Sequence, residues 1–367
     1  MKYLCLFVCA VQAAFSWGSV GHKIINKNAV IHLPPSMKLF IDRQSFLETH
    51  STDPDTRKTS DTAMWSEQYR HFLDVDEYPD FKNLNRNFSV LVNTFGWARV
   101  KENGTNPWWT VITMDSLTAQ LKRMDTTAAY QTAADLGHYV ADPHQPLHAA
   151  NNYNGQLTGN TGIHSRYETT MIGNHQAELT FTKDSVRYIS DVYAFAFDYI
   201  LKSNALCDSI FNADNAGKAA TGGSYTTKYY DTLWSRLGAM TKAQFQSATI
   251  DLASLWYTAW VNAGLLSMPT TVKKGTSKTP RSFNLRQNFP NPFNPSTTIQ
   301  FDVPHRSSVR LEIVSMDGKQ VASLVNGVME EGTYTTEWDA SAVASGMYLC
   351  RLASNDQVQT RKMLFIK

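Results

Sequence analysis

Histidine and carboxylate residues recur at helical spacing near the middle of the chain. His138 and Asp142 stand four residues apart at the end of a helical pattern, and His164 and Glu168 repeat that spacing. Residues four apart share one helix face, so each pair can hold one ion. His148 lies between the two pairs, in the segment HQPLH. Imidazole and carboxylate are ligands that zinc takes in compact sites. A single pair would more often be an ordinary polar helix face, but both together predict a zinc site.

The residues around these pairs predict a mainly helical domain over residues 17–266. Apolar side chains recur at helical spacing in several segments and few convincing strands appear. The predicted helices are 23–33, 117–141, 184–203 and 242–263. Ala133, Leu136 and Val140 are expected to be buried. The aromatic stripes of the last two segments are interpreted as core packing.

The pattern changes after this domain. Residues 267–283 are rich in Thr, Ser, Lys and Pro and have no apolar period, which predicts a linker. Beyond it, apolar and polar residues alternate, and the sequence MDGK at 316–319 is typical of a hairpin turn. We therefore predict a multidomain protein in which a small all-β, immunoglobulin-like sandwich covers residues 284–367.

Composition bounds the kind of protein. The chain has 367 residues, 43% hydrophobic and 18% charged, which indicates a globular protein of more than one domain. A formal net charge of +2 argues neither for nor against a polyanionic substrate. No apolar run reaches the roughly 18 residues that a membrane-spanning helix needs.

The first residues read as a signal peptide, residues 1–16. Lys2 supplies positive charge, residues 4–11 are apolar, and Ala14 and Ser16 are the small residues that signal peptidase reads. Cleavage there makes Trp17 the first mature residue. Val8 before Cys9 argues against a lipoprotein signal. Only Cys207 and Cys350 remain after cleavage, in different predicted domains, so disulfides are not expected to hold the protein together.

The C-terminal part resembles a known export domain. The segment QNFPNPFNPSTTIQFDVP, the later SMDGKQVASLV and SGMYLCRL, and the closing QTRKMLFIK occur in the order typical of the C-terminal sorting domain of the Por, or type IX, secretion system. The resemblance implies export across the outer membrane by that machinery, followed by release or attachment at the cell surface. The alternative is an immunoglobulin-like module without a sorting role.

The helical part resembles a family too. WGSVGH at Trp17, HFLDVD at His71, HYVADPHQPLHAAN at His138 and HSRYE at His164 are similar to motifs of the zinc-dependent superfamily that unites bacterial phospholipase C with the single-strand-specific nucleases of fungi and plants. The resemblance implies three zinc ions in a cleft of a helical domain. The ligands that it implies are the amino group and carbonyl of Trp17, with His22 and Asp142, for the first ion; His71, His138, Asp142 and an upstream aspartate for the second; and His148, His164 and Glu168 for the third.

The upstream aspartate is either Asp53 or Asp55. From its distance to His71 and its place before a basic pair we choose Asp55, and interpret Asp53 as a turn residue. Asp55 and Asp142 are then the carboxylates that act in catalysis through the ions. Arg57 stands close to the position where nucleases of this family carry an arginine that binds phosphate.

These motifs predict a secreted hydrolase of phosphodiesters. Zinc lowers the pKa of bound water to around 7 and neutralises phosphoryl charge, so a zinc-bound hydroxide can attack phosphorus. In the nuclease branch, Phe72 would stack on a base and Asp74 would bind its edge, which favours single strands. We predict an endonuclease that hydrolyses single-stranded DNA or RNA to 5′-phosphate products.

Two alternatives stay open. A phospholipase C acting on phosphatidylcholine-like lipids is favoured by HAAN after HQPL, by the short loop between His148 and His164, and by Glu168 in place of aspartate. The spacing from Trp17 to His22 is that of the nucleases instead. A surface adhesion protein with a structural zinc site is the third reading, and three ions with an N-terminal ligand disfavour it. His144 is interpreted as exposed or as a neighbour of the ligands, and His32, His50, His175 and His305 match no motif position.

Overall fold

The computed structural model describes residues 17–58, 66–83, 85–265, 273–274, 280, 282–341, 343–354 and 357–367. The predicted signal peptide lies outside the described residues, and so does most of the predicted linker. Among the described residues, no helix is both long and apolar enough to span a membrane. Cys207 and Cys350 are buried free thiols, as expected.

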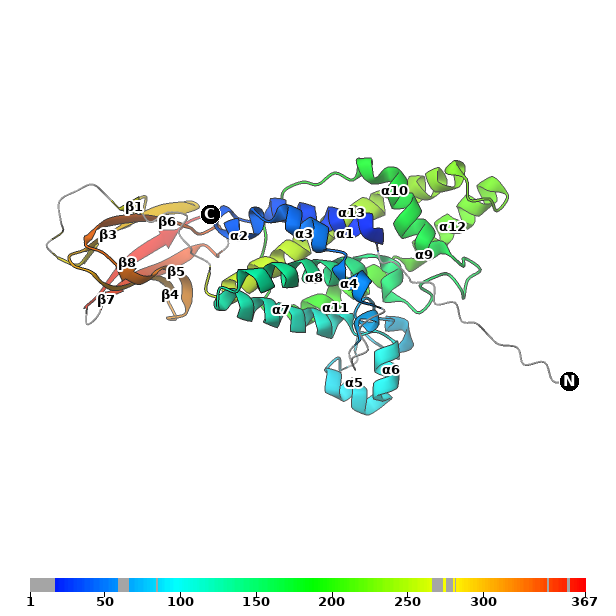
Figure 1. Cartoon of the computed structure of the whole chain (residues 1–367), viewed down its shortest axis with the longest axis horizontal. Helices are drawn as coiled ribbons and strands as arrows, with labels where there is room; N and C mark the ends of the chain where they lie inside the picture. The colour runs from blue at the N-terminus through cyan, green and yellow to red at the C-terminus, as the bar shows by residue number, and fades with distance from the viewer. Residues whose placement is uncertain are drawn as a thin grey trace.

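The described residues between 17 and 265 fold mainly into helices, most of which lie side by side around one large core (Figure 1). A smaller cluster includes Leu73, Trp108 and Phe197. The α-helices are α1 (Gly18–Ala29), α2 (Lys38–Ile41), α3 (Gln44–His50), α4 (Asp53–Arg57), α5 (Phe88–Phe95), α6 (Trp97–Glu102), α7 (Asn106–Lys122), α8 (Thr126–His144), α9 (Ile163–Ser165), α10 (Ile172–His175), α11 (Val192–Asn204), α12 (Cys207–Thr221) and α13 (Thr227–Asn262). Short turns of 3-10 helix are η1 (Val30–His32), η2 (Pro35–Met37), η3 (Glu67–Tyr69), η4 (Val75–Glu77), η5 (Pro146–Ala149) and η7 (Gln176–Glu178), and η6 (Arg166–Met171) is a π-helix. The mainly helical first domain is therefore confirmed.

The predicted continuous helix 117–141 is wrong, because the chain turns between α7 and α8. Met124 adopts a positive φ of 59°, and the side chain of Asp125 then caps α8 by accepting a hydrogen bond from the Ala128 amide. An N-cap of this kind satisfies amide groups that a helix start leaves without partners. Ala133, Leu136 and Val140 are fully buried, as predicted.

The predicted helix 184–203 is also wrong in its first half. α11 starts only at Val192, where Asp191 caps it. Before that point the chain runs extended along α13, and the amides of Arg187 and Ile189 donate hydrogen bonds to the hydroxyls of Ser254 and Thr258. Hydroxyls on the long α13 thus replace the hydrogen bonds that a helix would have made.

The C-terminal part consists of two antiparallel sheets whose inner faces form a second core. The strands are β1 (Lys273–Lys274), β2 (Asn284–Leu285), β3 (Ser296–Val303), β4 (Ser307–Ser315), β5 (Gln320–Met329), β6 (Gly332–Asp339), β7 (Gly346–Ser354) and β8 (Gln357–Phe365). Their orders are β1-β6-β3-β2 and β5-β4-β7-β8. Gly318, with a φ of 82°, makes the predicted hairpin turn between β4 and β5. The all-β class is confirmed, and β1 shows that two residues of the predicted linker pair with β6.

Candidate metal centre

Helix α8 holds the first pair of predicted ligands against helix α1. His138 and Asp142 leave one face of α8 and are fully buried, and His22 on α1 lies opposite them. The two helices approach closely because Gly137 has no side chain: a Cβ there would lie 2.1 Å from Asn26 Oδ1. The rings of His22 and His138 consequently stack, with centroids 3.8 Å apart and planes 7° apart.

Asp142 occupies the centre of this cluster and uses both of its oxygens. Oδ1 lies 3.2 Å from His22 Nε2. Oδ2 lies 2.8 Å from His71 Nδ1 and 3.2 Å from His138 Nε2. One carboxylate therefore joins two groups of donor atoms, which is the arrangement expected of a residue that bridges two ions.

The two upstream aspartates point in different directions. Asp55 Oδ1 lies 3.6 Å from His138 Nε2 and 3.9 Å from His71 Nδ1. The carboxylate of Asp53, two residues earlier on α4, instead binds His50 at 2.8 Å and Gln131 at 3.0 Å. The geometry thus brings Asp55, and not Asp53, to the cluster.

A second cluster forms between η5 and η6. Glu168 Oε2 lies 3.0 Å from His164 Nε2 and 3.7 Å from His148 Nε2, and all three residues are buried. Pro146 starts η5 after the end of α8, so the short turn presents His148 to the same space. In the described residues, atoms that can hold one ion gather in three groups: His22, Asp55 and His138; His71, His138 and Asp142; and His148, His164 and Glu168.

Hydrogen bonds fix which nitrogen of each histidine faces the clusters. The Nδ1 atoms of His138, His148 and His164 lie 2.8, 2.9 and 3.0 Å from the carbonyl oxygens of Ser51, His71 and Tyr153. Because a carbonyl only accepts, each of these Nδ1 atoms carries a proton, and Nε2 is the nitrogen that faces the other ligands. Zinc binds histidine through the lone pair of a ring nitrogen, and such outer hydrogen bonds typically orient its histidine ligands.

The residues present therefore fit zinc. His148 Nε2, a buried donor atom, makes no hydrogen bond within the described part of the chain. Each group combines imidazole with carboxylate, a set of ligands that zinc favours. Calcium and magnesium favour shells made of oxygen atoms alone.

Charge inside the clusters keeps the carboxylates ionised. Burial alone would raise the pKa of Asp142, but His138 and His71 hold it well below its ordinary value. In the same way burial opposes ionisation of Asp55, yet His138 and Lys58 lower its pKa to about 2. Burial lowers the pKa of His22, and the stacked His138 lowers it further, so the His22 ring is neutral at pH 7. Deprotonated ligands of both kinds are what metal binding requires.

Trp17, the predicted N-terminal ligand, directly precedes α1. Its side chain is fully buried, with its ring 4.5 Å from that of Phe245 and 5.8 Å from that of Tyr167. Gly18, the following residue, lies against the backbone of Glu168 and Thr169. The indole thus anchors this end of the helical domain beside the third group of ligands.

Comparison with known families places the helical part of the chain. The family model described as S1/P1 Nuclease matches residues 17–254. The chain belongs to the S1/P1 nuclease family. A second model, the secretion system C-terminal sorting domain, matches residues 287–367.

Solved structures similar to this member of the S1/P1 nuclease family include two bacterial toxins. The alpha-toxin of an avian strain of Clostridium perfringens is 11% identical, with a TM-score of 0.44, over 94% of each chain. The alpha-toxin of Clostridium absonum is 13% identical, with a TM-score of 0.44, over 94% of this chain and 96% of that one. These values are too low to support an argument about activity. No curated protein sequence matches the chain.

The predicted substrate residues are Phe72, Asp74 and Arg57. Phe72 and Asp74 follow the ligand His71, with Phe72 half-buried and Asp74 buried. Burial, with help from Asp76 and Glu77, raises the pKa of Asp74 to about 8. Arg57 points elsewhere: its guanidinium lies 2.8 Å from Asp135 and 3.2 Å from Glu67. A role for Arg57 in binding phosphate would have to compete with these ion pairs.

Two residues that support the ligands were not predicted from the sequence. Glu67 is buried, lies 3.6 Å from His71 Nε2 and accepts a hydrogen bond from Tyr139. Gln145 donates to Glu168 at 3.1 Å and accepts from the Leu147 amide. Their signals were the Glu four residues before His71 and the Gln inside HQPLH.

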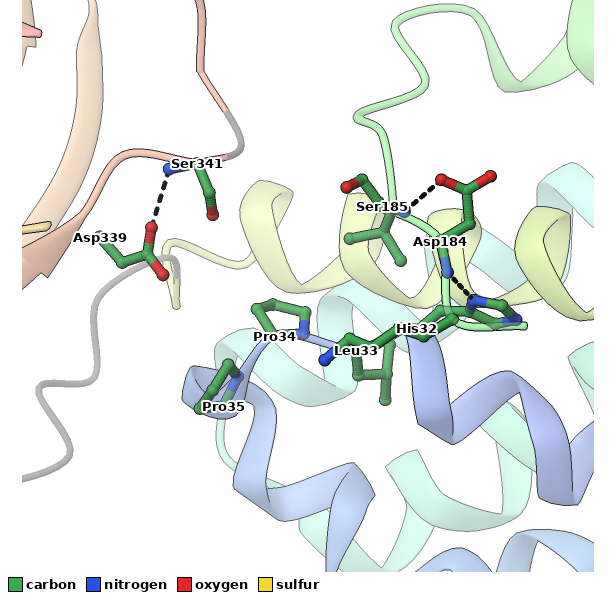
Figure 2. A pocket seen from close by; sticks show the side chains of 10 residues that line it. His32, Leu33, Pro34, Pro35, Asp184, Ser185, Asp339 and Ser341 are labelled. Carbon is green, nitrogen blue, oxygen red and sulfur yellow. Dashed lines mark hydrogen bonds between the residues drawn. The ribbon is translucent and has the colours of Figure 1, made fainter. Parts of the chain in front are cut away.

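The other histidines contact residues outside the three groups. His144 is buried rather than exposed, with Nδ1 bonded to the Val140 carbonyl and Nε2 3.2 Å from Asp251. His32 accepts a hydrogen bond from the Asp184 amide and contacts Thr249 through its other nitrogen (Figure 2).

A pocket of about 330 Å³ opens beside His32, lined on one side by Pro34, Pro35 and Asp184 and on the other by Asp339 and Ser341 of the C-terminal part (Figure 2). None of the residues that line it is a predicted ligand. The pocket is therefore separate from the metal centre.

Proposed function

We propose that this protein is a secreted, zinc-dependent phosphodiesterase that cleaves single-stranded DNA or RNA internally and leaves 5′-phosphate ends. The observation that supports this most is that eight of the nine predicted zinc ligands, from His22 to Glu168, gather in three groups, with the Asp142 carboxylate between His22 and His71, in a chain of the S1/P1 nuclease family. Three ions, with Trp17 and Asp55 as ligands, are part of the proposal.

The residues of the site suit hydrolysis of an anionic ester. Zinc, when bound, acidifies water and offsets the negative charge of the phosphodiester. Asp142 and Asp55 are ionised and hold the histidines by charge, while the carbonyls of Ser51, His71 and Tyr153 keep the rings oriented. Because the donors are held in place before substrate arrives, little reorganisation is needed during the reaction.

Preference for single strands rests on Phe72 and Asp74. A paired base hides its faces, whereas an unpaired base can stack on an aromatic ring. With a pKa of about 8, the Asp74 carboxyl keeps its proton at neutral pH and can donate a hydrogen bond to an acceptor on the base edge.

A phospholipase C is the second proposal. Asp76 and Glu77 place two acidic side chains in the short stretch that follows His71, and these would attract the cationic head group of a phosphatidylcholine-like lipid. Glu168 and the HAAN sequence after HQPL support the same alternative.

The location of the protein follows from its C-terminal domain. The sorting-domain match indicates export by the type IX machinery to the cell surface or the medium. We propose in addition that residues 1–16 are removed as a signal peptide, that residues 17–266 form the enzyme domain, and that residues 267–283 link it to the sorting domain at 284–367.

One parallel assay separates these proposals. The mature chain, loaded with zinc, is given single-stranded and double-stranded DNA, single-stranded RNA, phosphatidylcholine vesicles and a small phosphodiester. We expect the single strands to be cleaved fastest, with 5′-phosphate ends. Cleavage of lipid alone would reverse the order of the two proposals, and no cleavage of any substrate would favour an adhesion protein.

A matched pair of variants ties the activity to the site. His164→Ala removes a predicted ligand, whereas His175→Ala changes a histidine that pairs with Glu178 outside the three groups. Only His164→Ala is expected to lower the zinc content and the rate.

A further inference from the structure

Arg166 is a buried cation whose partners lie outside the metal centre. It stands in the chain between two ligands of the third group, His164 and Glu168, and is 9% exposed at the first residue of the π-helix η6. Its guanidinium donates to Asp214 Oδ1 on α12 at 2.9 Å, whereas Glu168, two residues on, contacts histidines of its own group. Asp214 is fully buried. Removing two charges from water opposes folding, so a role beyond simple attraction is expected of this pair.

The Arg166 guanidinium also binds two other parts of the fold. Nη1 donates to the Thr161 carbonyl at 2.9 Å and Nη2 to the Asn160 carbonyl at 3.1 Å, both in the loop 150–162 between η5 and α9. Nε donates to the Tyr229 hydroxyl on α13 at 2.9 Å. One side chain therefore ties this loop, α12 and α13 to η6.

Asp214 completes the network from the other end. Its Oδ1 also accepts a hydrogen bond from the Tyr229 hydroxyl, and its Oδ2 accepts one from the side chain of Asn160 at 2.6 Å. Lys218, one turn later on α12, lies 2.7 Å from Oδ2. The loop is thus held at Asn160 both by the backbone carbonyl and by the side-chain amide. Arg166, Asp214, Asn160 and Tyr229 together form a loop clasp.

The loop clasp is linked to the third group of ligands through the backbone of the loop. The Gly162 amide, next to the clasped carbonyls, donates to both the carbonyl and the side chain of Asn154. The Tyr153 carbonyl, one residue earlier, accepts the hydrogen bond from His164 Nδ1 at 3.0 Å. The loop and the guanidinium are in close contact, since a Cβ on Gly162 would lie 2.7 Å from Arg166 Nη1. A change in the clasp would therefore also move the carbonyl that orients a ligand.

We propose that Arg166 and Asp214 are positioning residues, which hold the third group of ligands in the geometry that binds a zinc ion. This inference rests on the proposed zinc centre. A planar guanidinium fixes the directions of several acceptors at once, which a point charge cannot do. Loss of the outer partners that orient metal ligands typically weakens metal binding by about 10- to 100-fold.

The alternative is an ion pair that only stabilises the fold. The two roles differ in what Arg166→Lys should do. Lysine keeps a positive charge beside Asp214, but its single ammonium cannot reproduce the hydrogen bonds to two loop carbonyls and a hydroxyl. A purely stabilising pair would be largely preserved in this variant, whereas a positioning residue would lose its effect.

The test measures zinc binding directly, so that it does not depend on the substrate. The mature full chain and its variants Arg166→Lys, Arg166→Met and Asp214→Asn are loaded with zinc and dialysed against rising concentrations of a chelator, and the retained zinc is measured by elemental analysis. Arg351→Met is the matched control, because Arg351 Nη2 lies 2.6 Å from a buried carboxylate, that of Glu312, in the C-terminal part.

We expect the variants of Arg166 and Asp214 to release one of the three ions at about 10- to 100-fold lower chelator concentration than wild type, and to keep the other two. Arg166→Lys should do so while its unfolding midpoint, measured without zinc, stays close to that of wild type. Arg351→Met should release its ions as wild type does. In a His164→Ala background, which already lacks a ligand for that ion, Arg166→Lys should change the release of zinc no further.

Hydrogen exchange of the zinc-free chain tests the loop clasp by itself. The amides of Asn160 and Gly162 donate to the carbonyls of Gly155 and Asn154 within the loop. These amides should exchange faster in Arg166→Lys than in wild type, because the loop opens more often when its carbonyls lose the guanidinium. Arg351→Met should leave their exchange unchanged.

The outcomes that overturn the inference are separate from failure of the proposed function. Equal release of zinc from wild type and Arg166→Lys would show that the clasp does not position the ligands, and so would simultaneous loss of all three ions, which indicates general unfolding. If Arg166→Met and Asp214→Asn do not fold, Arg166→Lys decides alone. If wild type binds no zinc, the proposed function fails, whereas faster exchange in Arg166→Lys would still show that Arg166 fixes the loop.

Discussion

Single side chains would decide how the proposed ions are shared, and Asp142 matters most because its two oxygens face different histidines. The side chain of Asp142 is short and its backbone is held in α8, so its carboxylate cannot follow a neighbour that moves. The choice between the two upstream aspartates tests this view of the site directly.

We expect Asp55→Asn to lose more bound zinc than Asp53→Asn. Asp55 Oδ1 lies within 4 Å of His138 and His71, whereas the carboxylate of Asp53 is occupied by His50 and Gln131. An amide is a much weaker zinc ligand than a carboxylate. Elemental analysis of both purified variants measures the loss, and a larger loss for Asp53→Asn would refute the choice.

Asp74 should make the stability of the protein fall as pH rises. Its pKa in the folded chain is about 8, raised mainly by burial, against an ordinary value of 3.8. The folded state therefore binds a proton that the unfolded state releases, and the resulting stability is fully present below about pH 4 and lost as pH rises through 8. Asp74→Asn removes this dependence and should be more stable than wild type at pH 8.5.

Chemical unfolding at pH 5, 7 and 8.5 measures this difference. Asp115→Asn, at an exposed aspartate of α7, is the control and should follow wild type at every pH. If the free energy of unfolding depends on pH in the same way for wild type and Asp74→Asn, the Asp74 carboxyl is solvated in the folded protein.

At the scale of elements, the contact between α1 and α8 sets the site. His22 and His138 lie 116 residues apart in the sequence, yet their rings stack because Gly137 lets α1 approach. The side chain of Asn26 fills the space next to Gly137 and donates to the His22 carbonyl, so it cannot easily turn away.

We expect Gly137→Ala to cost about 1–3 kcal/mol of stability, the usual penalty for overpacking a close contact. It should also lower zinc content, because α1 carries His22 with it when it moves. Gly173→Ala in α10, where a Cβ meets nothing within 4 Å, is the matched control and should be neutral or slightly stabilising. Unfolding midpoints and zinc content of both variants give the answer, and a Gly137→Ala protein equal to wild type would contradict it.

Local sequence patterns predicted which helices and strands exist better than they predicted where each one starts and ends. The i,i+4 pairs, the strands and the MDGK turn were readable because each depends on neighbours in sequence. The break at Met124 was not, since the apolar period continues through it and the turn is stabilised by the cap at Asp125. The extended course before α11 depends on hydroxyls of α13 some 65 residues later, which no local pattern encodes.

The residues of the candidate site also fall into two sets: those that the sequence pattern predicted and those that only the fold revealed. The histidine and carboxylate motifs were visible in the sequence because zinc imposes residue types and spacing. The partners of Arg57 were hidden, because Asp135 and Glu67 come from other segments and only the fold brings them together. The roles of Glu67 and Gln145 belong to this second kind.

At the scale of the whole molecule, the proposed cleavage before Trp17 would connect export with activity. We expect a chain that keeps Ser16 ahead of Trp17 to bind two zinc ions instead of three and to lose most of its activity. A peptide nitrogen has no lone pair to offer a metal, whereas a free amine does. Elemental analysis and rate measurements on chains that begin at Ser16 and at Trp17 test this, and three ions with full activity in the longer chain would exclude the amino group as a ligand.

Because the indole of Trp17 is buried, cleavage one residue too early or one residue too late would each impair the protein. A precursor cut one residue early would carry its free amine on Ser16 instead of Trp17. One cut late would lose a side chain that packs on Phe245 and Tyr167 and would leave a void in the core. An unprocessed chain would then be latent inside the producing cell, harmless to the phosphodiesters of its own genome and membranes. Maturation at the correct bond would serve as the activating step, taken only where the substrate belongs to something else.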